Sequence, residues 1–425
     1  MNNIQSIRGM HDILPAETPT WRWLEDQLVE LFDSYDFREI RIPLLEKAEL
    51  FTRAIGQGTD VVEKEMYAFS DRNGDLLSLR PEGTAGVVRA AIQHGLLQTP
   101  GLKVWYRGPM FRHERPQRGR QRQFHQFGAE VFGLPDAQAD AELIALGERI
   151  WRRLGLADHV RLEINTLGDR ADRVRYRDQL VDYLRPRADE LDADSQRRLD
   201  TNPLRIFDSK HPATQKIMAG APLLADALGD EARAHFEAVR GLLDGLGIAY
   251  RINPGLVRGL DYYCRTVFEW ITDDLGAQGT VCAGGRYDDL VAIQGGRPTP
   301  GIGFALGVER LVDLISRLDA ERPGGAQVYL VCQADPLEAL KLGEYLRDRL
   351  PGLRLACNLG GGSFKAQFKR ADRSGAAYAL ILGQDEVTRG RCQLKDLRGD
   401  GPQLDLARED LVDHLARLLP GLKPA

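Results

Sequence analysis

The chain has 425 residues, a length that favours two or three domains over a single hydrophobic core. Its formal net charge of -5 excludes binding of nucleic acid through bulk positive charge, so any such contact needs a local basic patch. The five cysteines are scattered without paired spacing, which excludes a zinc site or a disulfide framework and fits a reducing, cytoplasmic compartment with no tightly bound metal.

The beginning of the chain predicts one amphipathic helix and no targeting segment. Residues 1–15 lack the basic and apolar regions of a signal peptide. No run of about 18 apolar residues occurs anywhere, so no membrane span is expected. Apolar residues recur at helical spacing from Trp21 to Leu31 and predict a helix with one buried face. The extended segment 38–46 follows and is broken by Pro43.

The middle of the chain changes character twice. Residues 103–132 predict an antiparallel hairpin whose turn contains Pro and Gly. A helix closed by Gly155 and a strand within residues 159–168 follow it. From about 170 to 247 charged helical segments replace the strand patterns, which indicates a mostly helical insertion. Strand patterns then return and end in the glycine-rich segment 301–311.

The chain ends in a small α/β unit. The Pro- and Gly-containing stretch before residue 328 is the clearest linker. Beyond it, short apolar runs alternate with helical patterns. The predicted fold is therefore α+β, with an antiparallel sheet and flanking helices in its main domain. The predicted divisions are 1–169 and 248–320 as the two parts of the main domain, 170–247 as its insertion, 321–327 as a linker, and 328–425 as the terminal domain.

The second strand of the hairpin carries a pocket-like face. Because side chains alternate along a strand, Phe124, Gln126, Gly128 and Glu130 share one face. With the turn centred near residue 118, Arg112 is expected opposite Phe124 on that face. A cation, an aromatic ring, an amide and an acid make a poor core and a good pocket, in which Gly128 leaves room for a ligand. The alternative interpretation is a solvated basic loop beside a structural salt bridge.

Three further segments offer candidate site residues. Glu82 and Thr84 follow Pro81 and can accept hydrogen bonds from a ligand ammonium group, although ordinary turns contain the same residues. Arg258 precedes a glycine that permits close backbone approach, and a tyrosine pair that could equally be packing follows it. Glycines alternate with apolar residues in the strand before Arg310 and would leave an open floor, with Arg310 near its end, although helix–sheet packing explains these glycines equally well. The chain lacks a P-loop motif, so arginines and an aromatic ring would have to bind any nucleotide.

Together these stretches resemble the class II aminoacyl-tRNA synthetases, and among them the histidyl-tRNA synthetase family. Residues 111–130, FRHE followed by a loop and RQFHQFGAE, are similar to class II motif 2. GIGFALGVER (301–310) is similar to motif 3, and REIRIPLLE (38–46) to motif 1. LVRGLDYY (256–263) and CAGGRYD (282–288) are similar to the segments that mark the histidine enzymes. The resemblance covers nearly the whole chain and implies a class II catalytic domain with a C-terminal anticodon-binding domain.

The resemblance implies an ATP site with named contacts. Arg112 would contact the α-phosphate and the attacking carboxylate of histidine. Phe124 would stack under the adenine, with Arg310 on the other face and near the γ-phosphate. Arg120 would meet the outer phosphates, and Glu114 the adenine or its ribose. Magnesium would enter with ATP and bridge its phosphates.

The resemblance also implies a histidine pocket next to the ATP site. Glu82 and Thr84 would hold the ammonium group of the amino acid. Arg112 and Arg258 would be the catalytic residues, both in contact with histidine, with Arg258 beside the α-phosphate. The remaining residues implied for histidine binding are Gln126, Glu130, Tyr262, Tyr263 and Tyr287.

The implied activity is ligation of histidine to its tRNA in two steps. Histidine attacks ATP to give histidyl-adenylate and pyrophosphate, and a terminal ribose hydroxyl of tRNA(His) then takes the histidine. Gln117 and Arg118 would face the acceptor stem, the insertion the acceptor arm, and the terminal domain the anticodon. Motif 1 implies a homodimer.

Two alternatives stay open. The first is a catalytically silent, histidine-sensing regulatory paralogue of an ATP phosphoribosyltransferase, which usually lacks the C-terminal domain present in this chain. The second is a class II synthetase for another amino acid, against which the segment RGLDYY (258–263) argues.

Overall fold

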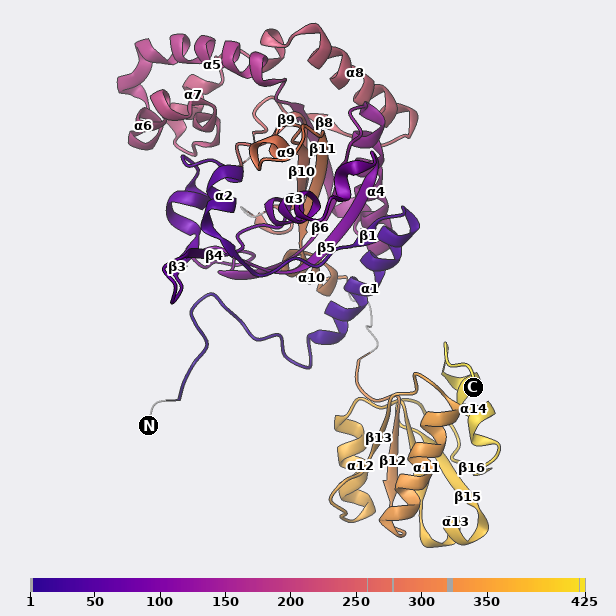
Figure 1. Ribbon diagram of the computed structural model, residues 1–425. Coiled ribbons are helices and arrows are strands. Elements are labelled where there is room, and N and C mark those ends of the chain that lie inside the picture. The colour runs from indigo at the N-terminus through magenta and orange to yellow at the C-terminus, as the bar shows by residue number, and fades with distance from the viewer. Residues whose placement is uncertain (1–2, 258, 277–278, 319–323, 420, 425) are drawn as a thin grey trace. The chain divides into compact units, whose positions relative to one another are not determined.

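The computed structural model describes residues 3–257, 259–276, 279–318, 324–419 and 421–424, with the backbone alone for residue 208. The chain divides into two compact units, residues 1–320 and 321–425 (Figure 1). Arg258 and residues 321–323 of the predicted linker lie outside the described residues. Within the described part of the chain, no helix combines the length and the apolar character needed to cross a bilayer.

An eight-stranded sheet forms the centre of the first unit, in the order β1-β5-β6-β11-β10-β9-β7-β8. Strand pairs are antiparallel except at the two edges, where β1 pairs with β5 and β7 with β8 in parallel. This confirms the predicted antiparallel sheet. The bounds are β1 (Arg38–Glu39), β5 (Leu102–Phe111), β6 (Gln123–Phe132), β7 (Arg161–Thr166), β8 (Arg251–Ile252), β9 (Cys264–Ile271), β10 (Thr280–Arg286) and β11 (Gly301–Gly307).

Four helices cover one face of this sheet and close the larger hydrophobic core. They are α1 (Thr18–Ser34), α4 (Ala137–Leu154), α8 (Asp230–Gly245) and α10 (Val308–Ser316). In α1 the residues predicted from helical spacing, including Trp21, Leu24 and Leu28, are buried in this core. Phe127, Ala129 and Val131 of β6 point into the same core, because alternate residues of a strand share a face. The other face of β6 is thereby left for the pocket.

The opposite side of the sheet carries smaller elements. A three-stranded antiparallel sheet β2-β4-β3 and short helices lie there, around a second core that includes Val104 and Val267. The strands are β2 (Leu45–Lys47), β3 (Tyr67–Ser70) and β4 (Leu76–Leu79). The helices are α2 (Ala48–Ile55), a π-helical turn (Val61–Glu65), α3 (Thr84–Gln93), a 3-10 turn (Leu96–Gln98) and α9 (Leu290–Ile293).

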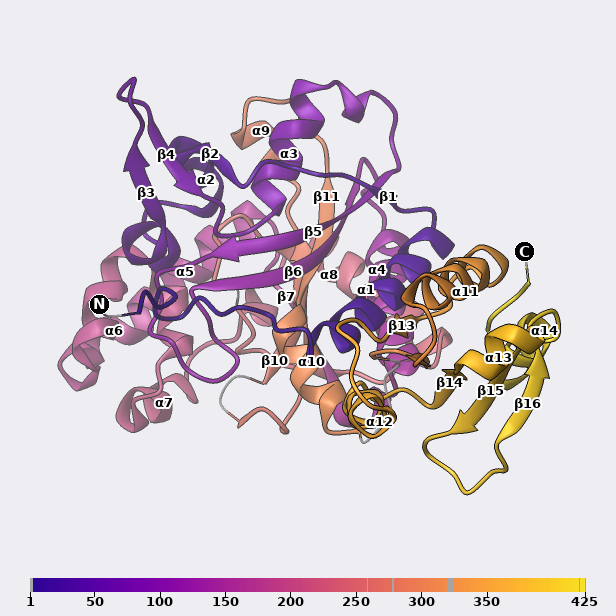
Figure 2. The same ribbon diagram turned by 90° about the horizontal axis from the view of Figure 1, so that it is seen from below.

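Residues 170–229 form a helical region at one side of the first unit (Figure 2). Its elements are α5 (Arg170–Leu184), α6 (Ala193–Thr201) and α7 (Pro212–Met218), joined by 3-10 turns at Arg185–Glu190, Pro203–Asp208 and Leu224–Ala227. Helix α8 follows, and its buried residues, such as Val239 and Leu243, belong to the large core of the sheet. The predicted insertion 170–247 therefore contains one helix that packs as part of the main core, and its boundaries as a domain stay a prediction.

The second unit is built on a five-stranded sheet in the order β13-β12-β14-β15-β16. Strand β12 pairs in parallel with β13 and β14, whereas β15 and β16 extend the sheet antiparallel. The strands are β12 (Val328–Cys332), β13 (Leu355–Cys357), β14 (Tyr378–Leu382), β15 (Arg391–Asp396) and β16 (Leu404–Ala407). The helices are α11 (Pro336–Arg349), α12 (Phe364–Arg373), α13 (Gln384–Arg389) and α14 (Leu411–Leu418). The short apolar runs read from the sequence thus form β12 and β14 in the interior of the sheet and β13 at its edge.

Candidate active site

A cavity of about 200 Å³ lies on the face of the sheet opposite the large core. Strands β6, β10 and β11 line it together with the loop before α3, the segment after residue 259 and the start of α10. The structure brings most of the predicted site residues together there. Those that line the cavity are Glu82, Thr84, Arg112, Glu114, Arg120, Phe124, Gln126, Tyr262, Tyr263 and Arg310.

The hairpin has the predicted face but not the predicted register. Phe124 pairs with Met110, and the Arg112 N–H donates to the Arg122 carbonyl, so Arg112 stands opposite residue 122 and not opposite Phe124. The error is two residues, which preserves the side-chain face. Arg112 is therefore diagonal to Phe124, and its guanidinium carbon lies 5.4 Å from the ring centroid. The Arg112 Nε also donates to the Pro81 carbonyl at 2.9 Å, which fixes the cation at the cavity wall.

Two buried carboxyl groups define the deep end of the cavity. Glu82 accepts the backbone N–H groups of Thr84 at 2.6 Å and Ala85 at 3.0 Å, so it caps the start of α3. The Thr84 hydroxyl donates to Glu130 at 2.7 Å. The Tyr287 hydroxyl donates to the other carboxyl oxygen of Glu130. Glu130 and Tyr287 lie just beneath the lining residues, where each is about 1% exposed.

Burial dominates the electrostatics of these acids. It raises the pKa of Glu130 to about 8, although the hydrogen bonds from Tyr287 and Thr84 oppose the shift. Burial also raises the pKa of Glu82, and the N–H groups of Ala85 and Thr84 oppose that shift. A cationic group entering this end of the cavity would stabilise the ionised form of both acids and so offset the cost of their burial. The deep end is therefore suited to an ammonium or an imidazole group.

Glycines around the cavity make room for its own side chains. A Cβ at Gly128 would overlap the ring of Tyr106, and so would a Cβ at Gly83. The expectation that Gly128 leaves room for a ligand directly is therefore wrong, because Tyr106 fills that space. On β11, a Cβ at Gly303 would overlap the carboxyl group of Glu130, and one at Gly301 would overlap the ring of Tyr287. The open floor expected from these glycines is occupied by pocket side chains.

The shallow end of the cavity is cationic. Arg120 forms an ion pair with Glu114, 2.7 Å from Nε to the carboxyl oxygen. Arg310, in the first turn of α10, donates from Nε to the Gly119 carbonyl at 3.0 Å and from Nη1 to the Thr280 carbonyl. Burial lowers the pKa of Arg310, and the nearby cations Arg120 and Arg112 lower it further. Three guanidinium groups crowded in this way favour a polyanionic ligand.

The tyrosine pair lines the cavity, whereas the two turn residues predicted to face tRNA lie outside its lining. Tyr262 and Tyr263 are 4% and 6% exposed, and the Tyr262 ring centroid lies 5.7 Å from that of Tyr287. Gln117 and Arg118, in the turn between β5 and β6, are exposed and absent from the cavity lining. Arg118 instead pairs with Asp313 of α10 at 3.0 Å. Arg258 lies outside the described residues.

Sequence reasoning missed two features of the site. Tyr106 lines the cavity opposite Gly128 in the β5–β6 ladder, and the correct register would have found it. The second is a buried cluster in which Arg286 pairs with Asp140 of α4, which also bonds His235 of α8. Burial alone would raise the pKa of Asp140, but His235 and Arg286 more than offset this and lower it. Arg286 directly precedes Tyr287 and so anchors the tyrosine that bonds Glu130.

Known proteins match the chain over nearly its whole length. A family model described as histidyl-tRNA synthetase matches residues 9–311, and one for an anticodon binding domain matches residues 327–418. A histidine--tRNA ligase of Halorhodospira halophila is 58% identical over 417 residues, 98% of each chain. The crystal structure of apo S. aureus histidyl-tRNA synthetase aligns with a TM-score of 0.80 and 35% identity, covering 97% of this chain and 99% of that one.

A more distant structure shares the fold alone. It is an ATP phosphoribosyltransferase regulatory subunit/histidyl-tRNA synthetase from Bacillus halodurans, with a TM-score of 0.63 and 23% identity, covering 89% of this chain and 97% of that one. The near-full-length identity to a histidine--tRNA ligase is far higher. These comparisons show that the chain belongs to the histidyl-tRNA synthetase family.

Proposed function

We propose that the protein is a histidine–tRNA ligase that forms histidyl-adenylate in the cavity and transfers histidine to tRNA(His). The observation that carries this proposal is the pairing, in one cavity, of a buried acidic end with a cationic outer end. The acidic end suits an amino acid with a basic side chain, and the cationic end suits a triphosphate. Membership of the family supports the same two-step reaction.

Histidine would occupy the deep end. Its ammonium group would be held by Thr84 and Glu82, and Gln126 would contact it from β6. Its imidazole would lie against the tyrosines Tyr262, Tyr263 and Tyr287 and bond Glu130, which is poised to gain or lose a proton near neutral pH. Polar groups that are buried around an imidazole stay unpaired when another side chain enters. Such a penalty can reach about 10⁴–10⁵-fold discrimination without an editing domain.

ATP, entering with Mg²⁺ as its substrate partner, would occupy the outer end. Phe124 would stack under the adenine, and Arg310 would close on the other face and meet the γ-phosphate. Arg120 would contact the outer phosphates, and Glu114, now paired with Arg120, would turn toward the adenine or ribose. Arg112 is held by Pro81 between the two ends, which suits a contact to both the α-phosphate and the histidine carboxylate.

The adenylation step needs positioning and charge stabilisation and no protein nucleophile. The histidine carboxylate would attack the α-phosphorus in line, forming a C–O–P bond as the bond to pyrophosphate breaks. Arg112 and Arg258 would stabilise the charge that grows on the α-phosphate oxygens. In the second step the tRNA ribose hydroxyl would attack the carbonyl carbon, with AMP as the leaving group.

Other parts of the chain would bind the tRNA. Gln117 and Arg118 are exposed on the turn next to the cavity, which suits contact with the acceptor stem. The anticodon-binding match supports recognition of the anticodon by the second unit. We further propose a cytoplasmic homodimer, on the basis of the motif 1 resemblance of residues 38–46.

Pyrophosphate exchange into ATP tests this function, with each amino acid supplied separately. Exchange with histidine alone is the expected result. No exchange with any amino acid would contradict it and would favour the histidine-sensing paralogue. The variant Arg258→Ala should lose exchange while histidine binding stays measurable by calorimetry, because its guanidinium would act on the α-phosphate.

A further inference from the structure

The helical region 170–229 contacts the segment that carries Tyr262 and Tyr263 of the proposed histidine pocket. Arg173, in the first turns of α5, donates from Nη1 to the backbone carbonyl of Tyr263. Asn202, directly after α6, donates from its amide to the carboxyl group of Asp261 at 3.4 Å. The two contacts lie two residues apart on the segment, on either side of Tyr262. The segment is thus held at two points by helices that do not line the cavity.

Asp261 is held from its other side as well. Its backbone N–H donates to the Ile55 carbonyl at the end of α2 at 3.1 Å. A Cβ at Gly56 would come within 2.5 Å of its carboxyl group, so glycine is needed there. Burial raises the pKa of Asp261, and the nearby cations Arg205 and Arg173 oppose that shift. Asp261 is therefore held by its backbone at the end of α2 and by its carboxyl group at the helical region.

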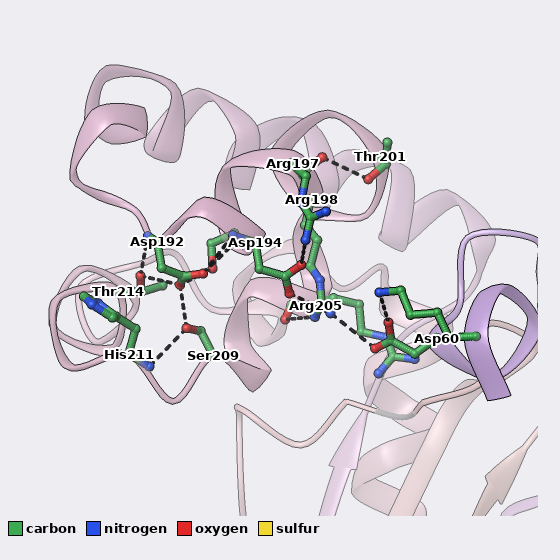
Figure 3. A network of polar contacts seen from close by, with 12 residues as sticks. Asp60, Asp192, Asp194, Arg197, Arg198, Thr201, Arg205, Ser209, His211 and Thr214 are labelled. Atoms are coloured by element: carbon green, nitrogen blue, oxygen red, sulfur yellow. Dashed lines mark hydrogen bonds and ion pairs between the residues drawn. The ribbon is translucent and has the colours of Figure 1, made fainter. Parts of the chain in front are cut away.

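The same helical region reaches the ATP side of the cavity. Arg198 of α6 lies between Asp194, at 2.8 Å, and Asp60, at 3.3 Å (Figure 3). Asp60 immediately precedes the π-helical turn that ends at Glu65. The Glu65 carbonyl in turn accepts the backbone N–H of His113, the residue after Arg112, at 2.7 Å. Both ends of the cavity thus have a structural connection to α5 and α6.

Local hydrogen bonds fix the first turn of α5, from which the side chain of Arg173 extends. Asp169 caps the helix by accepting the Asp172 N–H at 2.9 Å, and the Asp172 side chain accepts the Asp169 N–H at 3.0 Å. A reciprocal cap of this kind sets the direction of the first turn. The guanidinium of Arg173 reaches the Tyr263 carbonyl from that turn.

We propose that α5 and α6 position the tyrosine segment 260–263 for histidine activation, with Arg173 and Asn202 as positioning residues. The inference rests on the proposed function, since it assigns a role in the same adenylation step. Neither residue would touch substrate. Each would act by fixing the backbone from which Tyr262 and Tyr263 project.

The variant Arg173→Ala tests the first contact in histidine-dependent pyrophosphate exchange. We expect the KM for histidine to rise about tenfold, the equivalent of one charge-assisted hydrogen bond, while the KM for ATP changes less than about twofold. Arg173→Lys should recover part of the loss, because a lysine ammonium can still donate to the carbonyl. Arg177→Ala is the matched control, since Arg177 lies one turn along α5 and its hydrogen bond goes to Asp200 within the same region.

Two results would overturn the inference. One is an unchanged histidine KM in Arg173→Ala with wild-type exchange intact, which leaves the proposed function standing. The other is an equal rise in both KM values that Arg173→Lys does not rescue, which would mean general destabilisation. Absence of exchange in the wild-type protein would instead contradict the function itself.

The second contact gives an independent test if Arg173→Ala does not fold. Asn202→Ala and Asp261→Ala should each raise the histidine KM, and the double variant should raise it no further than the larger single effect. Fully additive effects would show that the two side chains do not act on each other and would contradict the proposal.

Discussion

Replacing Glu130 by glutamine should change how the stability of the first unit depends on pH. The ordinary pKa of a glutamate carboxyl is 4.5, whereas burial raises that of Glu130 to about 8. The folded state therefore holds the proton more tightly than the unfolded chain. The contribution of this proton to stability is complete below pH 4.5 and is lost as the pH rises through 8. Glutamine carries no such proton.

The size of the effect follows from the difference between the two pKa values. At about 1.4 kcal/mol per pKa unit, ionising Glu130 in the folded protein costs about 5 kcal/mol. Between pH 5 and pH 9 the free energy of unfolding of the wild-type protein should fall by about 4 kcal/mol relative to Glu130→Gln. Histidine should reduce this fall, because a cationic ligand stabilises the ionised carboxylate.

Urea unfolding followed by tryptophan fluorescence measures this difference. All five tryptophans lie within residues 1–320, so the signal reports on the first unit. The exposed Glu63→Gln is the control, and its stability should stay parallel to the wild type across the pH range. A difference between wild type and Glu130→Gln that stays constant from pH 5 to pH 9 would refute the assignment of a raised pKa to Glu130.

Three further predictions concern other parts of the first unit. Gly303→Ala should abolish histidine-dependent pyrophosphate exchange, because its Cβ overlaps Glu130 and lies 2.7 Å from the Ala129 carbonyl; exchange at the wild-type histidine KM would contradict this. Asp140→Asn should lower the unfolding free energy by about 3–5 kcal/mol in urea titrations, because it removes the fully buried anionic partner of Arg286 and leaves only the partly exposed Asp288 at 3.2 Å; a loss below about 1 kcal/mol would mean that Asp288 is a sufficient partner. Arg118→Ala should slow aminoacylation of tRNA(His) and leave pyrophosphate exchange unchanged, since Arg118 is exposed outside the cavity; a matching loss in both assays would place it in adenylation.

Much of the site could be predicted from the sequence because strand alternation is robust to small errors. The hairpin register was wrong by two residues, yet Phe124, Gln126 and Glu130 still share the predicted face, since an even shift preserves parity. Because of the same error, Tyr106 was not predicted as a site residue, since its place beside the cavity follows from its pairing with Gly128. The role of glycine was also misjudged, because only the three-dimensional structure tells which side chain uses the space.

Contacts between distant segments could not be predicted from one sequence. The Arg286–Asp140–His235 cluster joins β10, α4 and α8, and no local pattern links these residues. Glu82 was predicted as a ligand for an ammonium group, but its role as a helix cap depends on where α3 begins. Likewise, the helical sequence pattern of residues 170–247 did not indicate that α8 packs in the main core.

The ring of Tyr106, enclosed between Gly83 and Gly128, has a consequence for how this pocket tolerates mutation. Gly83, Gly128, Gly301 and Gly303 make room for the side chains around the deep end, so any larger residue at these positions displaces Tyr106, Glu130 or Tyr287. In a saturation library selected for charging of tRNA, these four glycines should be as intolerant as the carboxylates themselves. A change of amino-acid specificity would therefore need two substitutions together. One would replace a glycine by a larger residue, and the other would replace the neighbouring side chain by a smaller one.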